Sequence, residues 1–433
     1  AGTDMDMVSC GFLNTLEESL KEGKVTEEQI NAACRRVLEA KYKLGLFSDP
    51  YKYCDTLRVE KELYTTAHRA VAREIAAETF VLLKNEDHLL PLERKGKIAL
   101  IGPMADARNN MCGMWRMTCT PSCHGTLLEG IRSAAGDKAE ILYARGSNIY
   151  HDAELEKGGA GIRPLERGNE LQLLDEALHT AARADVIVAA LGECAEMSGE
   201  SASRTELGIP DAQQDLLKAL VKTGKPVVLL LFTGRPLVLN WEDANVHSIL
   251  NVWFGGSETG DAIADVLFGK VTPGGKLTTT FPRSVGQLPL YYNHLNTGRP
   301  DPDSHSFNRY SSNYLDMSNE PLYPFGYGLS YTNFSYGNLQ LSSDVLSRNG
   351  ELTVSVTVTN DGDFDGYEIV QMYLHDIYAE ISRPVKELKG FERIFLKKGE
   401  SREVKFVITE DDLRFYNSGL QYVYEPGEFD VMV

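Results

Sequence analysis

The chain has 433 residues, of which 42% are hydrophobic and 24% charged, a composition typical of a globular protein with two or three domains. Its formal net charge is −18, which disfavours nucleic acid and anionic membrane as partners and suits a neutral ligand. No run of 18 apolar residues is present, so no transmembrane helix is expected. The sequence opens without an initiator Met or a signal peptide, which favours a processed protein or a fragment whose start lies elsewhere.

Residues 1–53 have a helical pattern. Thr26 and Gln29 have the spacing of a capping box, in which each side chain bonds the other's backbone N–H. Apolar residues then recur at helical spacing, and Gly45 provides a natural helix end. Two helices cannot close a core alone, so we expect this segment to pack on another part of the protein.

From 68 to 290 the pattern alternates between helix and strand. Apolar strands are predicted at 97–102, 140–143, 185–191, 226–232 and 248–254, and helices at 68–83, 126–135, 170–184, 212–222 and 259–268. This alternation predicts a mainly parallel sheet covered by helices on both faces. The turn after the first strand lacks the Gly-rich phosphate fingerprint, so we reject a nucleotide-binding function and expect no cofactor.

The rest of the chain changes character twice. Residues 291–335 are rich in Pro, Asn, Gly and Tyr and predict a long loop and linker. From 336 to 433, short strands of alternating polarity predict an antiparallel β-sandwich in the style of immunoglobulin or fibronectin type III domains. With residues 54–67 as a linker after the N-terminal helices, the predicted fold class is multidomain, α/β followed by all-β.

Seven cysteines are too few for a disulfide scaffold. Cys112, Cys119 and Cys123 lie close together, and His124 follows. The spacing is not a recognised zinc pattern, so the prediction is no metal site, with free thiols or one local disulfide instead.

An acidic turn follows the predicted strand 185–191. Glu193, Glu196 and Glu200 lie among Gly, Ala and Ser residues, at the end of a strand where ligands bind in open α/β sheets. A carboxyl group there can serve as a general acid. On its own, the cluster favours solvated loop acids, which are common in so acidic a chain.

Several long motifs in order resemble family 3 glycoside hydrolases of the periplasmic β-glucosidase type. The matching segments are 36–51, 81–85, 90–92, 101–103, 274–277, 281–282, 291–300 and 323–331. The resemblance covers essentially the whole chain, but it corresponds to the C-terminal two-thirds of the family's enzymes. It implies that residues 1–53 are the helical end of a (β/α)8 barrel, followed by an α/β-sandwich domain and a fibronectin type III-like domain.

The resemblance also implies retaining hydrolysis by two carboxyl groups about 5–5.5 Å apart across the sugar. Glu200 matches the family's acid/base, with Glu196 the next candidate and Glu193 the last, because Glu193 has little reach from the strand end and is expected to cap a turn or pair with a basic group. Ser198 is a candidate for binding a sugar hydroxyl. Arg204 is expected to hold the loop by a carboxylate pair, with sugar contact as the alternative.

The family's nucleophile, an Asp in a Ser-Asp-Trp-like motif, has no counterpart in the sequence. Asp4 and Asp6 do not fit as substitutes. The isolated chain is therefore predicted to be unable to turn over a glycoside.

Other site and partner predictions follow from the resemblance. Trp115 is a candidate for stacking on a sugar, and Arg299 lies in a loop, 291–314, that is a candidate arm for the cleft rim or a homodimer. The expected ligand is a β-linked oligosaccharide or an aryl or alkyl glucoside, and the expected location is periplasmic or secreted. The alternatives are a β-xylosidase or other exo-β-glycosidase, and a non-catalytic carbohydrate-associated module.

Overall fold

The structure is a computed structural model that describes residues 2–116, 119–157, 165–300 and 308–433. The chain forms two compact units, Ala1–His68 and Arg69–Val433. Each unit is described by itself below. Among the described residues, none of the helices combines the length and the apolar character needed to cross a bilayer.

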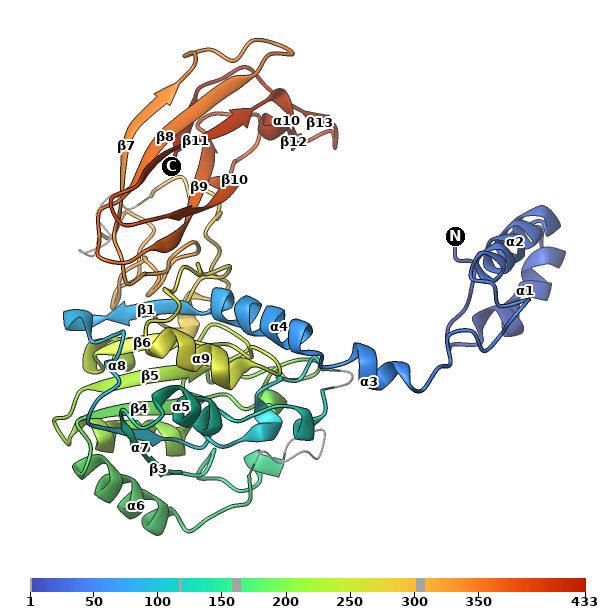
Figure 1. Ribbon diagram of the computed structural model, residues 1–433. Helices are drawn as coiled ribbons and strands as arrows, with labels where there is room; N and C mark the ends of the chain where they lie inside the picture. Colours follow the sequence, from blue (N-terminus) through green and yellow to red (C-terminus); the bar gives the residue numbers. More distant parts are fainter. Residues whose placement is uncertain (1, 117–118, 158–164, 301–307) are drawn as a thin grey trace. The chain divides into compact units, whose positions relative to one another are not determined.

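The first unit is helical (blue in Figure 1), with helices α1 (Gly11–Lys21), α2 (Glu27–Lys43) and α3 (Arg58–Glu62). The predicted capping box is present, because Thr26 and Gln29 exchange both bonds, at 3.3 and 2.9 Å. Gly45 follows α2 with a positive φ of 77°, as a helix end requires. No residue of these three helices is buried, which agrees with the expectation that they cannot form a core of their own.

The second unit contains a six-stranded sheet in the order β1-β6-β5-β4-β2-β3. All neighbouring pairs are parallel except β1, which runs antiparallel to β6. The strands are β1 (Val81–Asn85), β2 (Lys97–Ile101), β3 (Glu140–Ala144), β4 (Val186–Gly192), β5 (Val227–Phe232) and β6 (Ser248–Asn251). The predicted mainly parallel sheet is confirmed.

Helices cover this sheet, and two separate apolar clusters fill the space on its two faces (Figure 1). Every residue of β5 and β6 is buried, because each strand is enclosed from both sides. The helices are α4 (Thr66–Thr79), α5 (Leu127–Ala135), α6 (Glu170–Ala182), α7 (Asp211–Val221), α8 (Asn240–Asn245) and α9 (Thr259–Leu267).

The predicted helix over 68–83 is wrong in its last turn. Helix α4 ends at Thr79, and Val81, Leu82 and Leu83 belong to strand β1. All three side chains are buried, because the strand pairs with β6 at the edge of the sheet. A short apolar run beside an Ala-rich helix does not distinguish a helical turn from a buried strand. The strand predicted over 248–254 also ends earlier, at Asn251, and α8 was not predicted.

An antiparallel β-sandwich ends the chain and confirms the predicted all-β part. One sheet has the order β10-β9-β14 and the other β11-β8-β7. Inward side chains of both sheets form one core, and burial alternates strictly along β8 and β9. The elements are β7 (Phe334–Leu341), β8 (Leu352–Asn360), β9 (Gly366–Asp376), β10 (Glu387–Leu396), β11 (Ser401–Ile408), α10 (Glu410–Leu413), β12 (Phe415–Tyr416), β13 (Tyr422–Val423) and β14 (Phe429–Met432).

Candidate active site

The acidic turn lies at the carboxyl edge of the parallel sheet. Strand β4 ends at Gly192, and the 3-10 turn Ala195–Met197 follows. The backbone N–H of Ala195 donates to the side-chain oxygen of Asn110 at 2.6 Å. Because Asn110 lies in the loop after β2, this bond joins the loops of two neighbouring strands at the edge where α/β proteins bind ligands.

Glu193 has no exposed surface and uses both carboxylate oxygens inside the protein. One oxygen accepts from Arg204 at 2.8 Å and lies 3.0 Å from Nε of Arg235. The other accepts from the hydroxyl of Thr233 at 2.9 Å and the N–H of Gly234 at 3.1 Å. A carboxylate enclosed in this way is stabilised by its partners and cannot reach a substrate.

Arg235 extends this buried cluster to the loop itself. Its Nη2 donates to the carbonyl oxygens of Met197 and Ala202, the latter at 2.7 Å. These two carbonyls stand on either side of Glu200 in the sequence. One guanidinium, itself beside Glu193, therefore fixes the backbone before and after the tip of the loop.

Ser198 is nearly buried, with 7% of its surface exposed. It packs on Gly234, where an added Cβ would overlap both its Cβ and its Oγ. The loop can approach the end of β5 this closely only because position 234 has no side chain. Ser198 is thus packed against the segment that follows β5.

Glu200 is exposed at the tip, between Gly199 and Ser201, whose φ angles are 105° and 58°. An added Cβ on Gly199 would lie 3.0 Å from Cγ of Met114 and 3.6 Å from Nε1 of Trp115. Trp115 is 78% exposed. The tip and the Trp115 segment are thus neighbours, so that an exposed carboxyl group and an exposed indole share one surface.

Glu196 is partly buried, between the fully buried Glu193 and the exposed Glu200. Its Oε1 is buried without a hydrogen-bond partner among the described residues. Burial raises the pKa of this carboxyl group, and the charge of Arg116 opposes the rise. Glu196 lines a cavity of about 50 Å³ together with Ile149, Leu155, Glu156, Leu165, Cys194 and Met197, which leaves no room for a sugar ring.

Arg299 lies apart from these residues in its contacts. Its carbonyl accepts from the N–H of Ser312 at 2.8 Å. In the same loop, the backbone carbonyl of His294 accepts from the backbone N–H of Val385 at 2.9 Å. Among the described residues, no contact links Arg299 with Glu200. Residues 301–307 of the candidate dimer arm, 291–314, lie outside the described part of the chain.

Comparison with known proteins gives the family. The model of the glycosyl hydrolase family 3 C-terminal domain matches residues 80–331, and that of the fibronectin type III-like domain matches residues 368–433. This chain belongs to glycosyl hydrolase family 3.

Several known proteins match this chain over essentially its whole length. A periplasmic β-glucosidase of Salmonella typhimurium is 46% identical over 443 residues, covering 100% of this chain and 57% of its own length. A β-xylosidase of Formosa agariphila is 38% identical over 446 residues, covering 100% of this chain and 58% of its own. The crystal structure of β-glucosidase from Listeria innocua with isofagomine has a TM-score of 0.88 at 37% identity, covering 99% and 57% of the two chains. Other structures of that enzyme hold glucose or laminaribiose. The chain thus spans little more than half the length of these relatives.

Sequence reasoning missed Arg235 in this family 3 domain. It follows β5 as Thr233-Gly234-Arg235, and β5 lies next to β4 in the sheet. A basic residue directly after an apolar strand is a signal, since carboxyl ends of parallel strands share one edge. Its partner, however, follows from strand order, which the sequence does not give.

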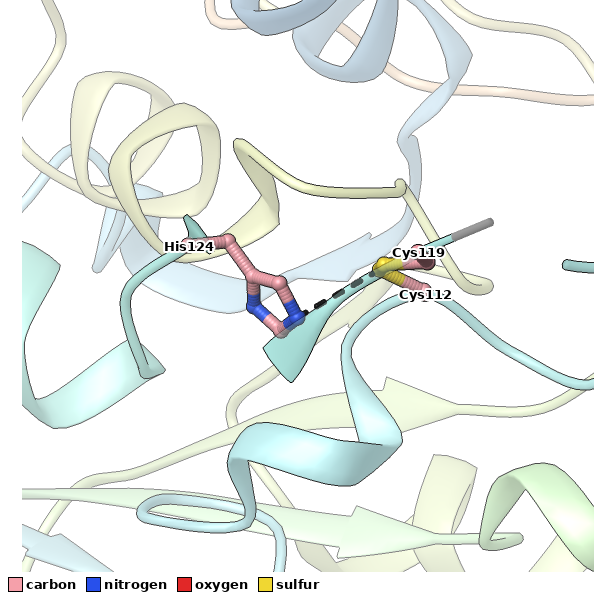
Figure 2. Close-up of side chains that lie close together, drawn as sticks. All are labelled: Cys112, Cys119 and His124. Atoms are coloured by element: carbon pink, nitrogen blue, oxygen red, sulfur yellow. Dashed lines mark hydrogen bonds between the residues drawn. A yellow bond between two sulfur atoms is a disulfide. The ribbon is translucent and has the colours of Figure 1, made fainter. Parts of the chain in front are cut away.

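The cysteines next to Trp115 form one local disulfide, which was one of the two predicted states. Cys112 is bonded to Cys119, while Cys123 is free. Figure 2 shows the imidazole of His124 directed at this sulfur pair, with Nε2 at 3.6 Å from Sγ of Cys112. The disulfide closes the segment that carries Trp115.

Proposed function

We propose that this chain supplies the acid/base part of a retaining exo-β-glycosidase that removes terminal β-D-glucosyl residues, with Glu200 as the general acid/base. The observation that carries this proposal is the contrast within one loop. Glu200 is exposed at the tip, and Arg235 holds the backbone on both sides of it. Glu193, in contrast, is buried and bonded to groups inside the protein. A catalytic carboxyl group needs both reach and a fixed position.

In the proposed reaction, a carboxylate nucleophile attacks the anomeric carbon while Glu200 donates its proton to the leaving glycosidic oxygen. The resulting Glu200 carboxylate then takes a proton from water as the water attacks the glycosyl–enzyme bond. The nucleophile is proposed to come from barrel residues outside these 433. The second carboxyl group would lie about 5–5.5 Å from Glu200.

Trp115 is proposed to stack on the sugar or aglycone, since its exposed ring adjoins the tip. Ser198 is proposed to orient a hydroxyl group or the tip itself. Arg204 is proposed to act through Glu193 by holding the loop, because that ion pair engages one end of its guanidinium. A role of Arg299 at the cleft rim stays a prediction.

A glucoside substrate is supported by the β-glucosidases among the relatives, whose structures hold glucose and laminaribiose. A β-xylosidase is the second candidate, because a relative of that description is 38% identical over the whole chain. Aryl β-glucoside and aryl β-xyloside, compared by kcat/KM on the complete enzyme, distinguish the two. A non-catalytic carbohydrate-binding module is the third, and the absence of any turnover by the complete enzyme would favour it.

The acid/base assignment is tested by Glu200→Ala in the complete enzyme, expressed from the reading frame extended upstream through a barrel. We expect kcat for glucosides with poor leaving groups to fall about 10²–10⁴-fold, the usual contribution of a general acid. With an activated aryl glucoside, for which loss of the general base makes the second step rate-limiting, azide should restore turnover and yield β-glucosyl azide. Glu206→Gln, an exposed acid further along the same loop, is the matched control. An unchanged kcat in Glu200→Ala would refute the assignment.

The isolated 433-residue chain is expected to release no aglycone from an aryl β-glucoside. Steady hydrolysis by the purified chain that Glu200→Gln abolishes would show that its nucleophile lies within these residues. Adding a separately expressed barrel should restore activity if the two halves associate.

A homodimer through the 291–314 loop and a periplasmic or secreted location complete the proposal. The first residues of that loop already contact the β-sandwich, since the ring of Tyr292 lies edge-on to that of Tyr373 in β9, with centroids 6.1 Å apart. A strictly monomeric complete enzyme in light scattering would exclude the dimer. Fractionation of the native host's cells tests the location.

A further inference from the structure

Three metal-ligating side chains meet beside the Trp115 segment. The sulfurs of Cys112 and Cys119 and one ring nitrogen of His124 lie within 4.8 Å of one another. His124 is buried, with 4% of its surface exposed, and stands just before helix α5 (Figure 2). None of the three residues belongs to the proposed acid/base machinery.

The hydrogen bonds of His124 do not suit a disulfide. Its Nδ1 lies 3.3 Å from the carbonyl oxygen of Gly125, an atom that can only accept. A neutral ring that donates there turns the lone pair of Nε2 towards Cys112, whose disulfide sulfur carries no proton to give. The other tautomer turns the Nδ1 lone pair towards the carbonyl oxygen instead. With the disulfide closed, either neutral form leaves one buried nitrogen unsatisfied.

A charged ring could donate at both ends, but a disulfide sulfur offers only a weak acceptor to the second N–H. The neutral ring with Nδ1–H on a carbonyl is the arrangement in which proteins present Nε2 to a metal ion.

The distance between nitrogen and sulfur fits the same chemistry. Zinc binds thiolate sulfur at about 2.3 Å and imidazole nitrogen at about 2.0–2.1 Å, so tetrahedral ligands lie about 3.6 Å apart. The separation of Nε2 and the Cys112 sulfur is 3.6 Å. Two sulfurs and one imidazole favour zinc over magnesium or calcium, which prefer oxygen ligands.

We propose that the reduced form of this cluster is a zinc site, with the thiolates of Cys112 and Cys119 and Nε2 of His124 as ligands, and that the disulfide is its oxidised, metal-free form. The spacing in the sequence is not a usual zinc pattern, so the proposal rests on the arrangement in space. Three protein ligands leave a fourth position for water.

The conversion balances with a thiol reductant. Two monothiol molecules give up their protons and become one disulfide, while the Cys112–Cys119 bond accepts two electrons and two protons to form two thiols. Zinc then displaces both thiol protons into solvent. The sulfurs must separate to about 3.8 Å to bind one tetrahedral ion. An oxidising compartment favours the disulfide, and a reducing one favours the metal form.

The test titrates zinc into the whole 433-residue chain, before and after reduction by a phosphine that is then removed, and measures bound metal against a chromogenic chelator. The reduced chain should gain one tight equivalent that the oxidised chain lacks. Cobalt in place of zinc should give thiolate charge-transfer absorption.

Single variants assign the ligands. Cys112→Ser and His124→Gln should weaken zinc binding at least 10-fold. Cys34→Ser and His179→Gln, which change an exposed thiol and an exposed imidazole outside the cluster, should leave it unchanged. Thermal melts of the oxidised chains check that His124→Gln is folded. Absence of a tight equivalent in the reduced chain, or wild-type affinity in folded His124→Gln, would overturn the proposal. No outcome depends on glycosidase activity.

Discussion

Two ends of one loop give glutamates opposite surroundings. The foot of the loop, defined here as Glu193 with Arg204 and Arg235, is an internal ion cluster with no exposed carboxylate surface. The tip, Gly199 to Ser201, exposes Glu200, which has no hydrogen bond or ion pair among the described residues. The comparison teaches that residue type alone does not identify a catalytic acid. A carboxylate that is buried and paired stabilises the loop, whereas one that is exposed and unpaired is free to contact a ligand.

The strongest way to break this comparison is to remove the foot. Glu193→Ala leaves two partly buried guanidinium groups without their shared carboxylate, and breaking a buried ion pair in this way typically costs about 3–5 kcal/mol. We expect a large drop in the melting temperature of the 433-residue chain. Glu200→Ala should change the stability by no more than about 0.5 kcal/mol, as for other exposed positions. Equal destabilisation by the two variants would contradict the division into foot and tip.

Arg235 sharpens the comparison, because it connects the foot to the tip. Arg235→Ala removes the hydrogen bonds from the charged guanidinium to the carbonyls of Met197 and Ala202. Each such bond contributes up to about 3 kcal/mol to stability. In the complete enzyme, a displaced tip should lower kcat/KM for glucosides with poor leaving groups, because that constant reports the step in which the acid donates its proton. For activated aryl glucosides, which need little acid assistance, kcat/KM should fall less.

Two further variants separate position from charge at Arg235. Arg235→Lys keeps the charge but not the planar fork, so it should recover only part of the lost rate. Arg183→Ala, at an exposed arginine on another face, is the control. If kcat/KM falls equally for all leaving groups, Arg235 does not act through proton donation by the acid.

The foot and the tip differ in how far the sequence predicts them. The strand 185–191 and the ligand-binding position of the turn after it are visible from apolar pattern and the strand-end rule. Glu193 as a paired, short-reach carboxylate also follows from its place at the strand end. Its partners Thr233, Gly234 and Arg235 do not, because they depend on β5 lying beside β4.

The same limit explains the other differences. Strand β1 is predicted as helix because no turn signal separates its three apolar residues from the helix before them, and only pairing with β6 makes them a strand. The spacing of three cysteines did not distinguish Cys119 from Cys123 as the partner of Cys112, since backbone direction decides the pairing. The boundaries at 53, 67, 290 and 335 stay predictions.

Glu196 lies in the sequence between the foot and the tip, and its substitution is expected to have the smallest effect on stability. Burial raises the pKa of its carboxyl group, so the folded chain favours the protonated form more than the unfolded chain does. Stability linked to this group is therefore full below the unfolded-state pKa and is lost as pH rises through the higher folded-state pKa. Glu196→Gln, which cannot ionise, should stabilise the chain by less than about 1 kcal/mol at pH 7.

That gain should shrink towards zero as the pH falls below about 4, where the unfolded carboxyl group is also protonated. Melting temperatures of Glu196→Gln and wild type between pH 4 and pH 8 measure the difference, with Glu206→Gln as the exposed control. A gain that is independent of pH would mean that the buried oxygen, rather than its charge, limits stability. A lower stability of Glu196→Gln than of wild type at pH 7 would mean that the charged Glu196 carboxylate stabilises the foot of the loop.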